Sequence, residues 1–98
     1  MQKSIFIATT SVILALTAVD SVSAASVEAC ENYAQRAVQQ YDIMNSRPKC
    51  RLATDGRWQP NYQNHYGWCR TAPSAWLRSE QKARDDHLKS CGAQVILD

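Results

Sequence analysis

The sequence is poor in the residues that usually fill a protein core. Its only phenylalanine is Phe6, and Val, Ile and Leu together contribute nine of residues 26–98. Glycine and proline occur only three times each. A domain of this size buries a smaller fraction of its surface than a larger domain does, so something besides aliphatic packing has to stabilise it. The length also excludes a multidomain enzyme and a nucleotide-binding α/β domain.

A strong charge of one sign is also missing. Eleven Lys and Arg residues stand against nine Asp and Glu residues, which gives a formal net charge of +2. Proteins that bind nucleic acid usually carry a clustered excess of positive charge. We therefore expect no nucleic-acid partner.

The one long apolar run lies at the N-terminus and has the features of an export signal. Lys3 gives it a positive start, and residues 5–19 are apolar apart from Thr and Ser. A small-x-small pattern follows in two overlapping frames, so cleavage is expected after Ala24 or Ala25. Residues 1–25 are therefore interpreted as a cleavable signal peptide.

The alternative for this run is an uncleaved membrane anchor. Its 15 residues are fewer than the roughly 20 that a membrane-spanning helix needs. We therefore expect no stable membrane anchor after cleavage. Residues 26–98 are expected to form a single domain that is periplasmic or secreted.

Four cysteines lie in this domain, and no two of them are close in the sequence. They are Cys30, Cys50, Cys69 and Cys91. Zinc sites and thioredoxin-like sites use pairs only a few residues apart, so we predict no metal site and no cofactor. An even number of cysteines in a small exported chain indicates two disulfides, which leaves no free thiol for catalysis.

A helix is predicted from Ser26 to about Asn45. Apolar residues recur there at spacings of three and four, which places them on one stripe of a helix. The stripe consists of Val27, Cys30, Tyr33, Ala34, Ala37, Val38, Tyr41 and Met44. Ser26 is a suitable N-cap, and Arg47-Pro48 stops the helix.

A second long helix is predicted from about Ser74 to Ser90. Ser74 is its expected N-cap, and Gly92 just past its end is the expected C-cap. The expected inner face consists of Trp76, Leu77, Ala83, His87, Leu88 and Cys91. Glu80 and Arg84 are four residues apart and are expected to pair along its flank.

The disulfide pairing depends on how these two helices pack. Antiparallel packing would bring Cys30, near the start of the first helix, to Cys91 at the end of the second. We therefore favour Cys30–Cys91, with Cys50–Cys69 closing the segment between the helices. The crossed pairing, Cys30–Cys69 with Cys50–Cys91, stays open because four cysteines allow three connectivities. The predicted fold is a small, disulfide-stapled all-α domain with two antiparallel helices and an aromatic-rich middle segment.

This middle segment, residues 46–72, combines basic and aromatic residues. The basic residues are Arg47, Lys49, Arg51, Arg57 and Arg70, and the aromatic ones are Trp58, Tyr62, His65, Tyr66 and Trp68. Thr54-Asp55-Gly56 predicts a turn. Pro60 is expected to open a short helix, which Gly67 weakens.

Two interpretations of the aromatic residues stay open. In the first, the rings cover a disulfide and complete the core, with their polar edges toward water. In the second, one or two rings stay exposed and stack on a sugar or base while an arginine binds a carboxylate or phosphate. The contact residues of the second interpretation are Arg57, Trp58, His65, Tyr66, Trp68 and Arg70.

No catalytic arrangement links the titratable residues. The chain has no Gly-x-Ser-x-Gly or His-Glu-x-x-His motif and no acidic calcium loop. A small hydrolase would need His65 or His87 beside an acid, and a core or backbone-bonded position is the simpler interpretation of each. We therefore predict that the protein is not an enzyme.

The favoured function is a non-catalytic interaction module. A small, cross-linked chain without a catalytic arrangement suits an accessory subunit or an inhibitor that docks on a larger envelope protein. The alternative is a glycan- or anion-binding module that uses the aromatic and basic residues of the middle segment.

Three motifs carry a family resemblance. They are Cys30-x-x-Tyr33-Ala34, Gly56-Arg57-Trp58 and His65-Tyr66-x-Trp68-Cys69. Together with the remaining cysteines, they resemble a pattern of small exported four-cysteine proteins of alphaproteobacteria, over nearly all of residues 26–98. The resemblance implies a bacterial periplasmic location and two disulfides. It implies no activity and no catalytic residues.

Overall fold

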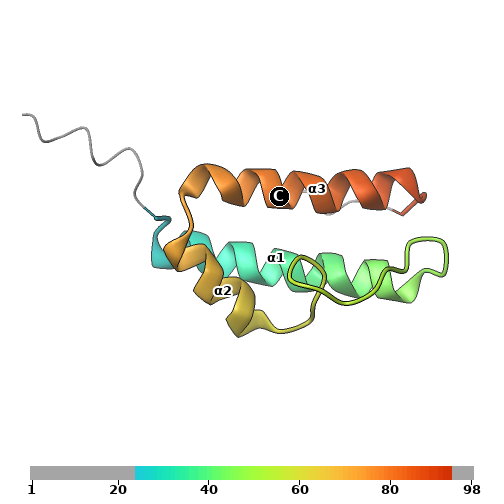
Figure 1. Cartoon of the computed structure of the whole chain (residues 1–98), viewed down its shortest axis with the longest axis horizontal. Coiled ribbons are helices and arrows are strands. Elements are labelled where there is room, and N and C mark those ends of the chain that lie inside the picture. Colours follow the sequence, from blue (N-terminus) through green and yellow to red (C-terminus); the bar gives the residue numbers. More distant parts are fainter. Residues whose placement is uncertain (1–23, 94–98) are drawn as a thin grey trace, which may run out of the picture.

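The computed structural model describes residues 24–93, which contain three α-helices (Figure 1). Helix α1 spans Val27–Ser46, α2 spans Tyr62–Thr71 and α3 spans Ser74–Ser90. The described range contains no strand element, so the predicted all-α class is confirmed. Most of the expected signal peptide and the last five residues of the chain lie outside this range. None of the helices within it has the length and apolar character to cross a bilayer.

Helix α1 begins and ends where local signals predict. The backbone N–H of Ala29 donates to the Ser26 hydroxyl at 3.1 Å, so Ser26 is the N-cap. At the other end Arg47 has an extended backbone. The buried stripe consists of Cys30, Tyr33, Ala34, Ala37, Gln40 and Met44. It differs from the predicted stripe in that Val27 is 48% exposed, whereas the polar Gln40 is buried.

The short helix expected after Pro60 is present as α2. Its N-cap is Asn61, whose side-chain oxygen accepts a hydrogen bond from the backbone N–H of Asn64 at 3.1 Å. Gly67 lies inside the helix, and Cys69 lies in its last turn. The cap and the disulfide through Cys69 offset the weak helix propensity of the glycine.

Helix α3 ends in the predicted glycine cap. Gly92 has a φ of 86°, a backbone conformation that favours glycine. The Gly92 N–H donates to the Lys89 carbonyl at 3.1 Å, and the Ala93 N–H donates to the Leu88 carbonyl at 2.8 Å. These two bonds form a Schellman motif, and Ala93 packs in the same buried cluster as Leu88.

The start and one inner position of α3 differ from the prediction. Ser74 is the first helical residue, and Pro73 takes the N-cap position without a side-chain hydrogen bond. Leu77 and Leu88 are buried as expected. Trp76, expected on the inner face, is 57% exposed, and Arg84 is buried instead.

Helices α1 and α3 run in the same direction, so the predicted antiparallel arrangement is wrong (Figure 1). Tyr33 near the start of α1 packs in one cluster with Leu77 near the start of α3. Met44 near the end of α1 packs in another cluster with Leu88 near the end of α3. The physical reason is that residues 47–61 and α2 together return the chain to the end where α1 began.

The disulfides are Cys30–Cys69 and Cys50–Cys91. All four cysteines are therefore cross-linked as predicted, but the favoured pairing is wrong and the crossed pairing is correct. With α1 and α3 parallel, Cys30 and Cys91 lie at opposite ends of the domain. One disulfide ties α1 to α2, and the other ties the turn after α1 to the turn after α3.

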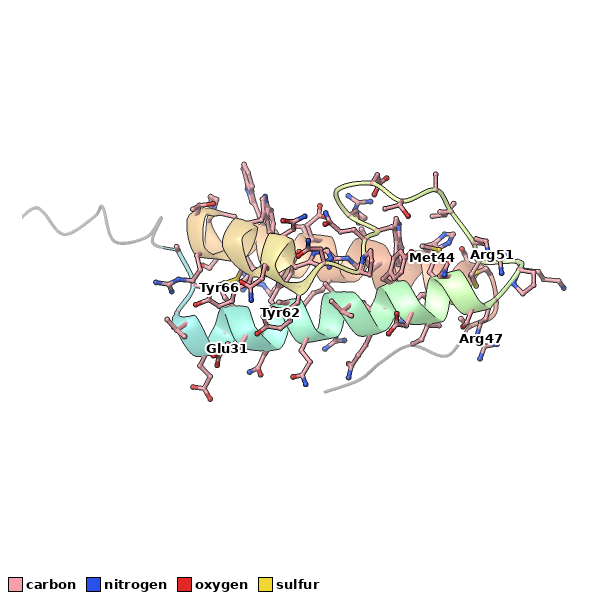
Figure 2. All side chains as sticks on the ribbon, turned by 90° about the horizontal axis from the view of Figure 1, so that it is seen from below. Glu31, Met44, Arg47, Arg51, Tyr62 and Tyr66 are labelled. Carbon is pink, nitrogen blue, oxygen red and sulfur yellow. A yellow bond between two sulfur atoms is a disulfide. The ribbon has the colours of Figure 1, made fainter. Side chains whose placement is uncertain are left out.

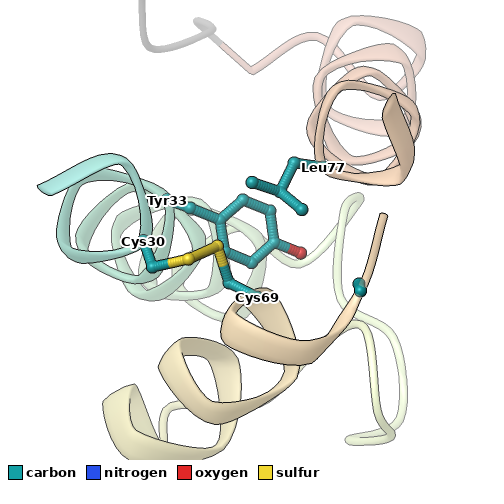
Figure 3. Packing of buried hydrophobic residues seen from close by; sticks show 5 residues of the cluster. Cys30, Tyr33, Cys69 and Leu77 are labelled. Atoms are coloured by element: carbon teal, nitrogen blue, oxygen red, sulfur yellow. A yellow bond between two sulfur atoms is a disulfide. The ribbon is translucent and has the colours of Figure 1, made fainter. Parts of the chain in front are cut away.

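Each disulfide lies in its own buried cluster. The first cluster consists of Cys30, Tyr33, Cys69, Ala72 and Leu77. Figure 3 shows the Tyr33 ring between the Cys30–Cys69 disulfide and Leu77 of α3. The second cluster consists of Met44, Cys50, Trp58, Leu88 and Ala93. Two small cores built around sulfur and single aromatic rings take the place of one aliphatic core.

Candidate binding pocket

A pocket of about 310 Å³ is bordered by all three helices and the loop that precedes α2. We call it the Arg84 pocket. Its lining residues are Tyr33, Gly56, Gln59, Asn64, His65, Trp68, Glu80 and Arg84. Of the six contact residues expected from the sequence, His65 and Trp68 lie in this lining.

Arg84 is a buried cation whose hydrogen-bond partners are neutral. Its side chain is 1% exposed. Nη2 donates to the Tyr33 hydroxyl at 2.9 Å, and Nε donates to the Arg57 carbonyl at 3.1 Å. Nη1 is buried and has no hydrogen-bond partner within residues 24–93. A buried charge with an unmet donor is costly, so this atom favours the binding of an acceptor.

Glu80 pairs with Arg57 and not with Arg84. Arg57 donates from Nε and Nη2 to the two carboxylate oxygens of Glu80, at 2.9 and 3.0 Å. These hydrogen bonds hold the pKa of Glu80 below its ordinary value of 4.5 and raise the pKa of Arg57. Arg57, expected to bind an external anion, already holds an internal one.

His65 is a buried, neutral ring in the wall of the pocket. It is 3% exposed, and its Nε2 lies 2.9 Å from the Gln59 carbonyl oxygen. Because a carbonyl only accepts, we assign the ring proton to Nε2. Burial lowers the pKa of His65 below its ordinary value of 6.5, against the opposing effect of the Gln59 hydrogen bond.

The two tryptophans expected to bind a ligand have different environments. Trp68 is 36% exposed, and its ring centre lies 5.6 Å from that of Tyr33. Trp58 is 4% exposed, and the His87 ring meets it edge to face at 5.4 Å. Trp58 therefore belongs to the core, as the first interpretation of the aromatic residues predicts, while Trp68 stays accessible.

Tyr66 and Arg70 do not line the pocket. Tyr66 stacks on Tyr62 one turn away along α2, with the ring centres 6.2 Å apart (Figure 2). Arg70 donates from Nη1 to the Ala25 carbonyl at 2.7 Å. Both residues therefore have structural partners on α2 or on the segment before α1.

A second hollow adjoins the Arg84 pocket. Its lining residues are Leu52, Ala53, Asp55, Gly56, Arg57, Trp58 and Glu80. Gly56 and Glu80 line both spaces, so the Arg57–Glu80 ion pair lies between them. The predicted turn forms one wall, because the Asp55 carboxylate accepts the backbone N–H groups of Arg57 and Trp58 at 2.9 and 2.8 Å.

The residue that sequence reasoning missed most clearly is Arg84. The sequence does hold a signal for its burial, because position 84 is seven residues after Leu77 and four before Leu88. It therefore lies on the same stripe as two buried leucines. Because arginine is charged, Arg84 was expected to be exposed, and this expectation outweighed the periodicity that indicated burial.

Other arrangements that could carry chemistry are weaker. Ser46 and Lys49, like Ser79 and Lys82, have the spacing of a serine nucleophile and its lysine base, but all four residues are exposed. Lys82 also bonds Asp86 at 2.7 Å. Within residues 24–93, no group of three or more His, Cys, Asp or Glu side chains could hold a metal ion.

Comparisons with protein-family models, curated proteins and solved structures found no match to this chain. The resemblance to small exported proteins of alphaproteobacteria therefore stays a hypothesis.

Proposed function

We propose that this protein is a non-catalytic binding module, periplasmic or secreted, that docks on a larger envelope protein. Two disulfides are typical of an oxidising environment outside the cytoplasm. The expected signal peptide agrees with that location.

The observation that carries the proposal is an exposed face around the Arg84 pocket. We call it the tryptophan face and define it by Leu52, Trp68 and Trp76, together with the Arg57–Glu80 pair. Trp68 lines the Arg84 pocket and Leu52 lines the second hollow. Trp76 lies one helical turn before Glu80, which lines both. Exposed tryptophan and arginine are enriched at the energetic centres of protein interfaces.

The tryptophan face is held in place before any partner binds. The Cys30–Cys69 disulfide fixes the end of α2 that carries Trp68. The hydrogen bond from Arg84 to the Arg57 carbonyl fixes the loop to α3. A preformed surface loses less conformational entropy on binding, so a small area can still bind tightly.

The geometry gives less support to the other functions considered. A general base needs a ring nitrogen free to take a proton and a partner that orients the ring. The His65 ring is buried, and within residues 24–93 no carboxylate is hydrogen-bonded to it that would stabilise its protonated form. A glycan site built on Trp58 and Arg57 loses support because Trp58 is buried and Arg57 is paired.

The proposal is tested by size-exclusion chromatography of native extracts from cells that produce the tagged full chain. The wild type is expected to elute in a larger complex of fixed stoichiometry. The double variant Trp68→Ala/Trp76→Ala is expected to elute as the free chain, because it removes both aromatic contacts. Val27→Ala is the matched control, since Val27 is exposed on α1 and lines neither hollow.

Two outcomes would contradict the proposal. A wild-type protein that elutes alone in every extract would remove the docking function. A complex that survives the double variant but dissociates in Val27→Ala would move the interface to another face.

A further inference from the structure

We propose that the Arg84 pocket is a carboxylate-binding site, and that it receives an acidic side chain or the C-terminus of the docked protein. This inference rests on the proposed function, because it names the chemical group that the partner presents. Arg84 is the cation of the site, and Tyr33 is the second donor.

The charges around the pocket favour a single anion. Arg84 and Glu80 are the charged residues of the lining, and Glu80 is already neutralised by its two hydrogen bonds to Arg57. His65 is neutral near pH 7 because burial lowers its pKa. Asp55, in the adjoining hollow, binds backbone N–H groups of its own turn. The uncompensated charge is therefore the guanidinium of Arg84.

Two donors belong to residues that line the pocket. Nη1 of Arg84 has no partner within the described residues. The Tyr33 hydroxyl accepts from Arg84, and burial raises the pKa of Tyr33, so the phenol keeps a hydrogen that it can donate. Two adjacent donors, one of them charged, match the two oxygens of a carboxylate.

Contact between a bound carboxylate and Nη1 requires a small side-chain rearrangement. Nη1 is buried, whereas Trp68 is the partly exposed aromatic residue of the lining. Rotamer changes of exposed side chains are common when interfaces form, even where the backbone stays fixed. A shift of Trp68 would therefore report that the pocket is occupied.

The lining favours a protein carboxylate over an acidic sugar. A sugar needs several free polar groups for its hydroxyls. The amides of the lining are engaged with each other, since Asn64 donates to the Gln59 side chain at 2.8 Å and Gln59 donates to the Gly56 carbonyl at 3.0 Å. The exposed Trp68 of the lining and the exposed Leu52 of the adjoining hollow add apolar surface that suits a protein partner.

The test is an NMR titration of the folded chain with both disulfides formed. The probe is N-acetylglycinate, which mimics a chain terminus, and its neutral match is N-acetylglycinamide. The indole signal of Trp68 and the guanidinium signals of Arg84 are followed. The acid is expected to shift both signals saturably, with a dissociation constant of about 1 mM for so small a ligand, and the amide is expected to shift neither.

Variants locate the binding. Arg84→Met and Gly56→Leu are expected to weaken it by about tenfold or more, whereas Arg78→Met on the exposed side of α3 leaves it unchanged. Because Arg84 is buried, its replacement can unfold the domain, and Gly56→Leu then decides. A Cβ at Gly56 would meet nothing within 4 Å, and Gly56 lines the pocket, so a leucine there is expected to narrow the pocket without disturbing the core.

Equal responses to the acid and the amide, or no saturable response, would overturn the inference. So would acid binding that is unchanged in Gly56→Leu. Tighter binding of galacturonate than of N-acetylglycinate would replace the protein carboxylate with an acidic sugar. If no carboxylate binds while the complex still depends on Trp68 and Trp76, this inference fails and the proposed function stands. If the acid binds but the wild type elutes alone, the proposed function fails.

Discussion

Trp58 and Trp76 show how differently the same residue type is used in this small protein. Trp58 fills the second core cluster, whereas Trp76 is mostly exposed at the start of α3. Sequence reasoning placed Trp76 on an inner face and offered Trp58 as a ligand contact. A single tryptophan supplies much of the apolar area buried in so small a cluster. The different burial of Trp58 and Trp76 should therefore be visible in the free energy of unfolding.

We predict that Trp58→Ala lowers the free energy of unfolding by about 3–5 kcal/mol, because it leaves a cavity beside the Cys50–Cys91 disulfide. Trp76→Ala should change it by less than about 0.5 kcal/mol, since little buried area is lost. Urea denaturation of both variants measures the difference. A loss in Trp76→Ala as large as that predicted for Trp58→Ala would show that Trp76 is buried in solution.

His65 should make the stability depend on pH in a defined window. Burial lowers its pKa in the folded state, with Arg84 adding to the lowering and Glu80 opposing it, so below about pH 6.5 the unfolded chain binds more protons than the folded one. The free energy of unfolding is therefore predicted to fall as the pH drops through and below this value. Glu80, whose pKa is also lowered, adds a further loss below its ordinary value of 4.5.

The comparison of wild type and His65→Gln at pH 7 and pH 5.5 isolates the histidine. The difference in the free energy of unfolding between pH 7 and pH 5.5 should be smaller in the variant, because the glutamine side chain does not titrate. A wild-type protein that becomes more stable at pH 5.5 would contradict the predicted direction of the pKa change.

At the scale of the elements, helix ends and interiors give glycine opposite roles. Gly67 lies inside α2 with nothing within 4 Å of an added Cβ, and its φ is not in the left-handed region. Gly92 follows α3 with a φ of 86°. The same substitution should therefore have opposite effects at the two positions.

We predict that Gly67→Ala raises the free energy of unfolding by about 0.5–1 kcal/mol through better helix propensity. Gly92→Ala should lower it by about 1 kcal/mol, because alanine is strained in this conformation. Thermal and urea denaturation of the two variants measure the sign of each change in the free energy of unfolding. A stabilising Gly92→Ala would mean that the Schellman motif is not formed.

The helices were predictable because their signals are local. The caps at Ser26 and Gly92 and the periodicity between Cys30 and Met44 lie within a few turns of chain, and the structure contains all of them. The burial of Arg84 was not predicted, because a buried guanidinium needs acceptors from α1 and from the loop. Those acceptors, Tyr33 and the Arg57 carbonyl, become neighbours only in the folded chain.

At the scale of the whole molecule, the relative direction of α1 and α3 was the decisive unknown. It depends on the path of residues 47–61, a segment without hydrophobic periodicity that could equally have formed a local loop closed by its own disulfide. The wrong disulfide pairing, Cys30–Cys91, was favoured because the two helices were expected to be antiparallel. The His65 and Trp68 part of the pocket was predicted because aromatic residues near a cysteine are visible in the sequence. The burial of Arg84 and the pairing of Glu80 with Arg57 were not predicted.

Peptide mapping without reduction should identify Cys30–Cys69 and Cys50–Cys91 as the linked pairs. The sequence separations are 39 and 41 residues, so loop-closure entropy predicts that each cross-link contributes about 4 kcal/mol. Cys30→Ser/Cys69→Ser and Cys50→Ser/Cys91→Ser should therefore destabilise the domain to a similar extent in urea. A peptide that links Cys30 to Cys91 would contradict the fold.

The pairing of the two disulfides also determines what happens when a protease cuts the peptide chain. Residues 51–57 are all exposed and contain Arg51 and Arg57, two sites for a trypsin-like protease. Hydrolysis there separates Cys30 and Cys50 on one fragment from Cys69 and Cys91 on the other, and both disulfides join the two fragments. The clipped product is a two-chain molecule that comes apart only on reduction, so a single cleavage by an extracellular protease does not release either half.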